Sequence, residues 1–89
     1  MTPLEIAFDA SLVTVLVVLA WRTLAARDLT QSAVLFIAFG LTMALAWARL
    51  GAPDLALAEA AVGAGLTGVL VLYVARVFES RREPDGEGE

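Results

Sequence analysis

One acidic side chain, Glu59, lies well inside a long apolar stretch of this sequence. Residues 51–78 read GAPDLALAEAAVGAGLTGVLVLYVARVF, a composition that predicts a helix crossing a membrane. On insertion scales, a carboxylate at the centre of such a helix costs about 2.5–3.5 kcal/mol, so ionisable residues in membrane spans usually face protein or water. Glu59 is therefore the first candidate for a group that takes up and releases a translocated ion.

A plainer interpretation of Glu59 stays open beside this one. The residue lies only about 8 Å below the start of its predicted helix, at 1.5 Å of rise per residue. From that depth its carboxylate could reach the headgroup region or form an ion pair with Arg49, which ends the preceding apolar segment. Glu59 is thus expected either on an ion route or in an interfacial ion pair.

Two other polar residues of the same stretch are candidates for the ion route. Asp54 follows Pro53, a residue suited to the first helical position, and an acid there favours the helix start electrostatically. A structural role is therefore the simpler interpretation of Asp54. Thr67 follows Glu59 by two turns, and its hydroxyl could help to hydrate a path across the membrane. Asp9, in the first turns of the chain, is most simply an interfacial residue.

Three glycines, Gly63, Gly65 and Gly68, spell G-x-G-x-x-G, yet they do not indicate nucleotide binding. The nucleotide fingerprint requires a preceding strand, whereas these glycines lie within a predicted membrane helix. Together with neighbouring alanines they form a small-residue face on which another helix can pack closely. The glycines also lower the cost of a π-bulge, so close packing is expected and a local distortion is a further hypothesis. The alanines are Ala60, Ala61 and Ala64.

Composition restricts the class of protein and the chemistry open to it. The chain has 89 residues, of which 60% are hydrophobic and 18% charged, against about 45–50% and about 25% in soluble domains. It is expected to be an integral membrane protein. It contains no Cys, His or Lys, so thiolate and imidazole chemistry, Schiff bases and a metal centre are not expected. No cofactor, no catalytic site and no surface for nucleic acid are expected either.

The apolar segments predict an all-α protein with three transmembrane helices at about 4–24, 29–50 and 53–78. Each has about 20 residues or more, enough for a bilayer core of about 30 Å. Asp28, followed three residues later by Gln31, resembles a capping box at the start of the second helix.

The charges predict a direction of insertion. With three spans, the linker between the first two spans lies on the same side as the C-terminal end, and this side carries all the arginines but Arg49. The positive-inside rule then places the C-terminus in the cytoplasm and the N-terminus outside. Residues 1–83 are expected to form one membrane domain, and the acidic residues 84–89 a disordered tail. The arginines of the cytoplasmic side are Arg22, Arg27, Arg76, Arg81 and Arg82.

The run GAPDLALAEAAVGAG, residues 51–65, resembles the signature of the MbhD-like small membrane subunits. The family pattern is an apolar segment ending in G-A-P-D, followed by A-[LT]-x-E/Q-A-x-V-G-A. The resemblance covers the second and third predicted spans, while the first matches only as a hydrophobic segment. The matching positions are Ala52, Pro53, Asp54, Ala56, Glu59, Ala60, Val62 and Gly63.

The resemblance implies a subunit in the ion-translocating membrane arm of a multi-subunit complex related to respiratory complex I. By that analogy a π-bulge is expected within 63–68, and Glu59 is expected near a proton or sodium route. The expected partners are other membrane subunits, the lipid bilayer, Na⁺ and H⁺, and the expected location is the cell (inner) membrane. We expect an Mrp-type cation/proton antiporter. The alternative is the arm of an energy-converting hydrogenase or another complex I-related assembly.

Two interpretations come from other classes of protein. A rotor-ring subunit of an ATP synthase is also short and glycine-rich, but it has two spans and its acid lies mid-membrane. A purely structural subunit that packs within a larger membrane complex fits the small-residue face equally well. Replacement of Glu59 by Gln separates that second interpretation from an ion-translocating role.

Overall fold

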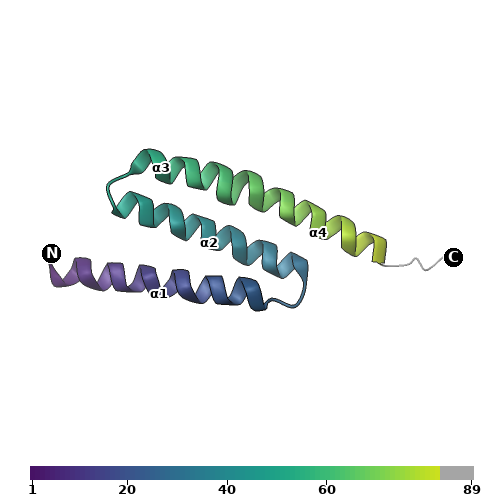
Figure 1. Ribbon diagram of the computed structural model, residues 1–89, viewed down its shortest axis with the longest axis horizontal. Coiled ribbons are helices and arrows are strands. Elements are labelled where there is room, and N and C mark those ends of the chain that lie inside the picture. The colour runs from purple at the N-terminus through teal and green to yellow at the C-terminus, as the bar shows by residue number, and fades with distance from the viewer. Residues whose placement is uncertain (83–89) are drawn as a thin grey trace.

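The computed structural model describes residues 1–82, and these form three long helices joined by short connections (Figure 1). Helix α1 spans Pro3–Ala25 and α2 spans Leu29–Arg49. The third long helix is continuous but has three parts: α3 (Pro53–Ala58), a π-helical segment η1 (Glu59–Thr67) and α4 (Gly68–Arg82). The predicted disordered tail, residues 84–89, lies outside the described residues.

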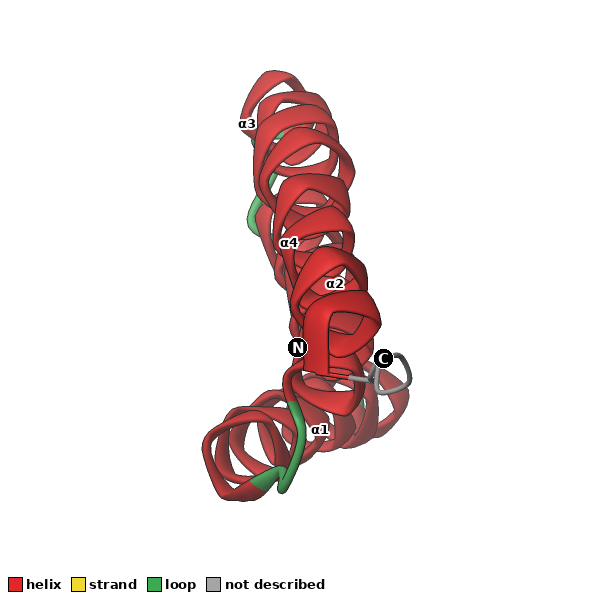
Figure 2. Cartoon of the chain, turned by 90° about the vertical axis from the view of Figure 1, so that its right-hand side faces the viewer, coloured by secondary structure: helices red, strands yellow, loops and turns green. Residues whose placement is uncertain are grey.

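The three long helices form a single flat layer rather than a bundle. They run antiparallel, with α2 in the middle, and the molecule measures 64 × 24 × 13 Å (Figure 1). Helix α2 contacts α1 on one side and α3, η1 and α4 on the other, whereas within residues 1–82 α1 does not touch the third helix. Seen from the end, the third helix and α2 stand in one narrow row, and α1 lies at its foot, turned to one side (Figure 2). The layer therefore exposes both of its faces.

All three long helices are long and apolar enough to cross a membrane, as the sequence predicted. Their surfaces agree with that environment, because most of the large apolar side chains are exposed and α1 has no buried residue. A water-soluble domain would bury such side chains to gain hydrophobic stabilisation. These exposed surfaces are suited to contact with lipid or with other membrane proteins.

Local capping signals explain where the helices begin and turn. The Thr2 hydroxyl accepts a hydrogen bond from the Glu5 N–H, and the Glu5 carboxylate accepts one from the Thr2 N–H, a capping box that the sequence analysis did not identify. Asp28 Oδ1 accepts from the Gln31 N–H at 2.7 Å and so caps α2. Beyond α2, Gly51 has a φ of +83°, a left-handed conformation that glycine adopts without a steric penalty.

The third helix is longer than the apolar segment that predicted it. The span was expected to end at residue 78, but α4 continues to Arg82 through Glu79 and Arg81. Hydropathy indicates where a segment leaves the apolar part of the bilayer, and a helix of good helix-forming residues can continue into water beyond that point.

The buried core is small and lies between α2 and the third helix. Its apolar members are Ala33, Ala64 and Ala75, which are 0%, 3% and 0% exposed, and Gly40 and Gly68 are buried beside them. Small side chains let two helix backbones approach closely, which is how membrane helices gain packing energy without a hydrophobic driving force between them. The core therefore binds the third helix to α2.

Candidate functional site

Glu59 is the first residue of the π-helical segment, and its half-buried side chain lies along its own helix over Gly63. A Cβ atom at position 63 would collide with the Glu59 carboxylate and lie 3.1 Å from its Cδ. Residues four apart share a helix face, so a larger side chain at position 63 would displace the carboxylate. Gly63 thus leaves the space in which the acid of Glu59 rests.

The Glu59 carboxylate has neither a hydrogen bond nor an ion pair within residues 1–82. Arg49, which the sequence suggested as its partner, turns instead toward α1. Its Nε donates to Asp9 Oδ1 at 2.7 Å and its Nη2 to Asp9 Oδ2 at 3.4 Å, with Glu5 Oε1 3.8 Å from Nη2. The acid of the third span is thereby left without a counter-charge in the described part of this chain.

The backbone around Glu59 departs from the α-helix over nine residues. At the C-terminal end of the segment the Gly68 N–H donates to the carbonyl oxygens of Gly63 and Gly65, five and three residues earlier. The sequence placed a distortion within 63–68, whereas the π-helical segment begins four residues earlier, at Glu59 itself. π-Helical segments are rare in proteins and occur often at functional sites. Because this one begins at Glu59, the region around Glu59 is a candidate functional site.

Helix α2 braces the π-helical segment through two close contacts. A Cβ at Gly40 would lie 3.2 Å from both the Cβ and the backbone N of Ala64, and a Cβ at Gly68 would collide with Ile37 Cγ1. The three glycines of the third helix therefore differ in their surroundings. Gly68 faces α2, Gly63 faces the Glu59 side chain, and a Cβ at Gly65 would lie 3.2 Å from the Ala60 carbonyl of its own helix.

Asp54 and Thr67 lie on the same helix as Glu59 but not beside it. Asp54 is exposed in the first turn of α3, and Thr67 is the exposed last residue of η1. At 1.5 Å per residue they lie about 8 Å before and about 12 Å after Glu59 along the axis. Within residues 1–82 neither side chain forms a hydrogen bond, in contrast to Thr42, whose hydroxyl donates to the Ala38 carbonyl.

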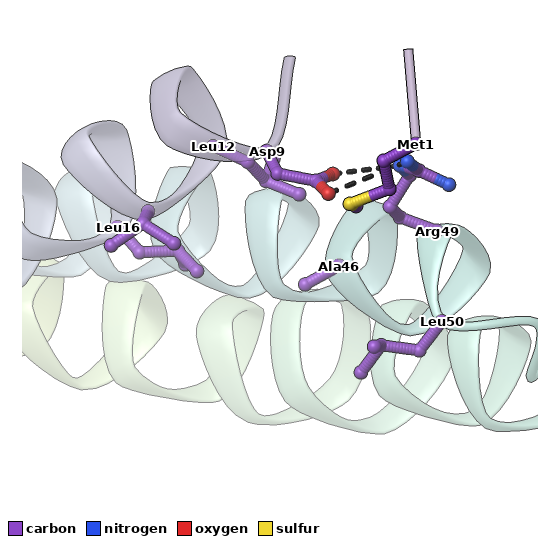
Figure 3. Close-up of a pocket in the computed structure, with 8 residues that line it drawn as sticks. Met1, Asp9, Leu12, Leu16, Ala46, Arg49 and Leu50 are labelled. Carbon is purple, nitrogen blue, oxygen red and sulfur yellow. Dashed lines mark hydrogen bonds and ion pairs between the residues drawn. The ribbon is translucent and has the colours of Figure 1, made fainter. Parts of the chain in front are cut away.

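Sequence reasoning missed the charged cluster of Arg49, Asp9 and Glu5, which joins α1 to α2 (Figure 3). The signal was present: Glu5 and Asp9 are four residues apart, and antiparallel neighbours bring the start of one helix next to the end of the other. The cluster borders a cleft of about 370 Å³. In the part of the chain that the structure describes, no three acidic side chains gather as metal ligands.

Comparison with known protein families identifies the family of this chain. Residues 14–80, well over half of the sequence, match the MbhD family, whose description is the D subunit of MBH. The chain belongs to the MbhD family. Its members are small membrane subunits of membrane-bound hydrogenases and Mrp-related complexes, so the protein is a membrane subunit with other membrane subunits as partners. No curated protein and no solved structure matched the chain.

The family match begins at residue 14, so it divides α1 into an unmatched first half and a matched second half. It includes α2, the π-helical segment and the second half of α1, so the MbhD likeness reaches further than the two spans on which the sequence motif lies. Arg49 lies inside the matched region, whereas Glu5 and Asp9 lie before it. The carboxylates that hold Arg49 therefore come from a part of the chain that the family comparison does not include.

Proposed function

We propose that this MbhD-family chain is a subunit of an Mrp-type cation (Na⁺)/proton antiporter and that it helps to form the ion-translocating membrane arm. In this proposal Glu59 takes up and releases the ion or proton, and Asp54 and Thr67 mark the ends of the polar route along the third helix. Gly63, Gly65 and Gly68 serve packing and the π-helical backbone. The chain has no catalytic site of its own and acts only within the complex.

One observation carries the proposal: Glu59 begins the π-helical segment and has no counter-charge within residues 1–82. π-Helical segments are rare and frequent at functional sites, and a free carboxylate in one provides oxygen ligands for a cation or a proton acceptor. A carboxylate in a membrane span is costly unless it faces protein or water. Its retention without an ion-pair partner supports a role in transport.

The proposed orientation places the N-terminus outside and the C-terminus in the cytoplasm of the cell (inner) membrane. Its support is the distribution of arginines, since five of the six lie at the end of the first span, in the linker after it or at the end of the third span, on one side of the membrane. Glu59, nearer the start of the third helix, would then lie closer to the outer surface than to the cytoplasm.

A second candidate is the membrane arm of an energy-converting hydrogenase, which the family description favours because it names MBH. Purification of the complex through a tag on this chain distinguishes the two assemblies. Co-purification of a hydrogen-consuming or hydrogen-evolving activity assigns the hydrogenase arm. Co-purification of antiporter subunits without that activity assigns the Mrp-type complex.

The test of the proposed role is Glu59→Gln in the intact complex. Cation-dependent proton flux is measured in inverted membrane vesicles, and assembly is followed on a blue-native gel. Glu79→Gln is the control, because Glu79 is an exposed carboxylate on the same helix outside the apolar span, and Gln keeps an oxygen that can accept from the Thr30 hydroxyl. We expect Glu59→Gln to abolish flux in an assembled complex and Glu79→Gln to leave it near the wild-type level.

Two results would count against this role. Normal flux with Glu59→Gln would leave the third helix as a packing element, the structural interpretation that the close contacts at Gly40 and Gly68 also fit. Loss of the complex on the gel would assign Glu59 to an assembly contact instead.

A further inference from the structure

The cleft between α1 and α2 has two chemically different ends (Figure 3). Its volume of about 370 Å³ is within the range of small-molecule sites, about 300–1,000 Å³. Asp9 and Arg49 line one end and pair with each other there. Apolar side chains line the remainder, namely Met1, Leu12, Val13, Leu16, Ala46 and Leu50.

A second cleft of about 220 Å³ continues along the same pair of helices. On α1 the lining residues of both clefts recur every three or four positions from Asp9 to Leu24, which places them on one face of the helix. That stretch rises about 22 Å, most of the depth of a bilayer core of about 30 Å. The second cleft is lined by Ala20, Thr23, Leu24, Phe36 and Phe39. We name the two clefts together the α1–α2 furrow.

The dimensions of the furrow favour a chain over a helix as its occupant. Helices α1 and α2 are in contact, so the furrow is a depression along their seam and not a gap between them. A helix about 10 Å across and as long as the furrow occupies on the order of 1,700 Å³, several times the clefts' volumes of about 370 and 220 Å³. An acyl chain is narrow and apolar and lies in the direction of the membrane normal, as the furrow does when α1 spans the bilayer.

The charged end of the furrow complements a headgroup that carries both signs of charge. Asp9 occupies the Nε and one Nη of Arg49, which leaves other N–H donors of the guanidinium free for a phosphate. The Glu5 carboxylate lies 3.8 Å from Arg49 and is 48% exposed, so it can accept from an ammonium group. Arg49 is the last residue of α2, which places the cluster at the level of lipid headgroups.

We propose that the α1–α2 furrow is a binding site for one phosphatidylethanolamine molecule. One acyl chain lies along the apolar side chains, the phosphate meets the free donors of Arg49, and the primary ammonium donates to Glu5. A choline headgroup has no N–H to donate, and an anionic headgroup would place its charge beside two carboxylates without an ammonium to offset them. The site is independent of the ion that the complex transports.

The experiment captures the occupant of the furrow in the intact complex. A photoreactive benzoylphenylalanine replaces Val13, which lines the furrow, or Val18, which lies on the opposite face of α1 and lines neither cleft. The two valines lie on the same helix and are both exposed, Val13 to 59% and Val18 to 48%. The complex is reconstituted into vesicles with equal amounts of phosphatidylethanolamine, phosphatidylcholine and phosphatidylglycerol, irradiated, and analysed by mass spectrometry of the labelled peptide.

We expect the probe at position 13 to capture phosphatidylethanolamine about fivefold more often than phosphatidylcholine, the ratio that one ion pair of about 1 kcal/mol provides. At position 18 we expect capture in proportion to composition. Glu5→Gln, which keeps a residue able to complete the α1 capping box, should reduce the preference at position 13 to that at position 18. Equal capture at both positions, no captured lipid at position 13, or a cross-link from position 13 to another subunit would each overturn the proposal.

Discussion

The two sides of α2 pack against their neighbouring helices in different ways. Toward the third helix, α2 packs Gly40 against Ala64 and Ile37 against Gly68, so each of these contacts has a glycine on one side. Toward α1 it presents larger side chains, buries none of the residues of α1, and leaves the α1–α2 furrow open. One interface depends on close backbone approach, whereas the other depends on polar links near its two ends.

Those polar links are specific. Arg49 pairs with Asp9 near one end of α1, and at the other the Ser32 hydroxyl donates to the Thr23 carbonyl at 3.0 Å. On the opposite side of α2, the Thr30 hydroxyl donates to Glu79 Oε2 at 2.8 Å. This difference indicates that α2 and the third helix form the closely packed unit that positions Glu59, whereas α1 leaves lateral surface available for lipid or partner subunits.

The largest effect is expected where the close interface is forced apart. Gly40→Leu inserts a side chain where even a Cβ would lie 3.2 Å from Ala64, and overpacking of this kind costs about 1–3 kcal/mol. We expect a lower temperature of thermal inactivation for the purified complex and less assembled complex on a blue-native gel. Ala48→Leu, at an exposed position of α2, is the control and should change little. Equal melting of the two variants would refute a close-packed α2–third-helix interface.

A smaller and more local effect is expected at Gly63. In Gly63→Ala the new methyl group displaces the Glu59 carboxylate while α2 still packs on Ala64 and Gly68. We expect cation-dependent proton flux to fall by up to about 100-fold, the cost of a misplaced reacting group, in a complex that still assembles.

The control for this effect is Gly65→Ala, whose methyl would meet the Ala60 carbonyl at 3.2 Å and not the carboxylate. It separates crowding of the π-helical backbone from displacement of Glu59. If both variants lose flux equally, the backbone and not the position of the acid is responsible.

The smallest effect is expected at the charged link to α1. Arg49 and Asp9 are each about one third exposed, 32% and 33% for their side chains, and pairs of this kind contribute about 1 kcal/mol or less. Arg49→Gln and Asp9→Asn should each lower the melting temperature slightly, and the double variant should lose less than the sum of the two. A double-mutant cycle measures this coupling, and strict additivity would show that the pair contributes nothing to docking of α1.

Much of the architecture could be predicted because the signals are local. The three spans follow from runs of apolar residues, and the cap of α2 follows from Asp28 three residues before Gln31. The charged cluster of α1 could not be predicted in the same way, since Asp9 and Arg49 are 40 residues apart and meet only if the right faces of two helices are turned together. The π-helical segment was expected at the glycines, yet it begins at Glu59, four residues before the first of them.

Some features of this protein follow from its sequence alone, and others follow only from how its helices pack. The sequence by itself determined a membrane protein of three spans, with one acid inside the third and no Cys, His or Lys, because transfer of a segment into the bilayer depends on the sum of its own residues. Only the tertiary structure decided that Arg49 turns to Asp9 and leaves Glu59 unpaired within residues 1–82, and that α1 touches α2 alone in that part of the chain. Those outcomes depend on the rotation and lateral order of the helices, which packing between their faces determines and hydropathy does not encode.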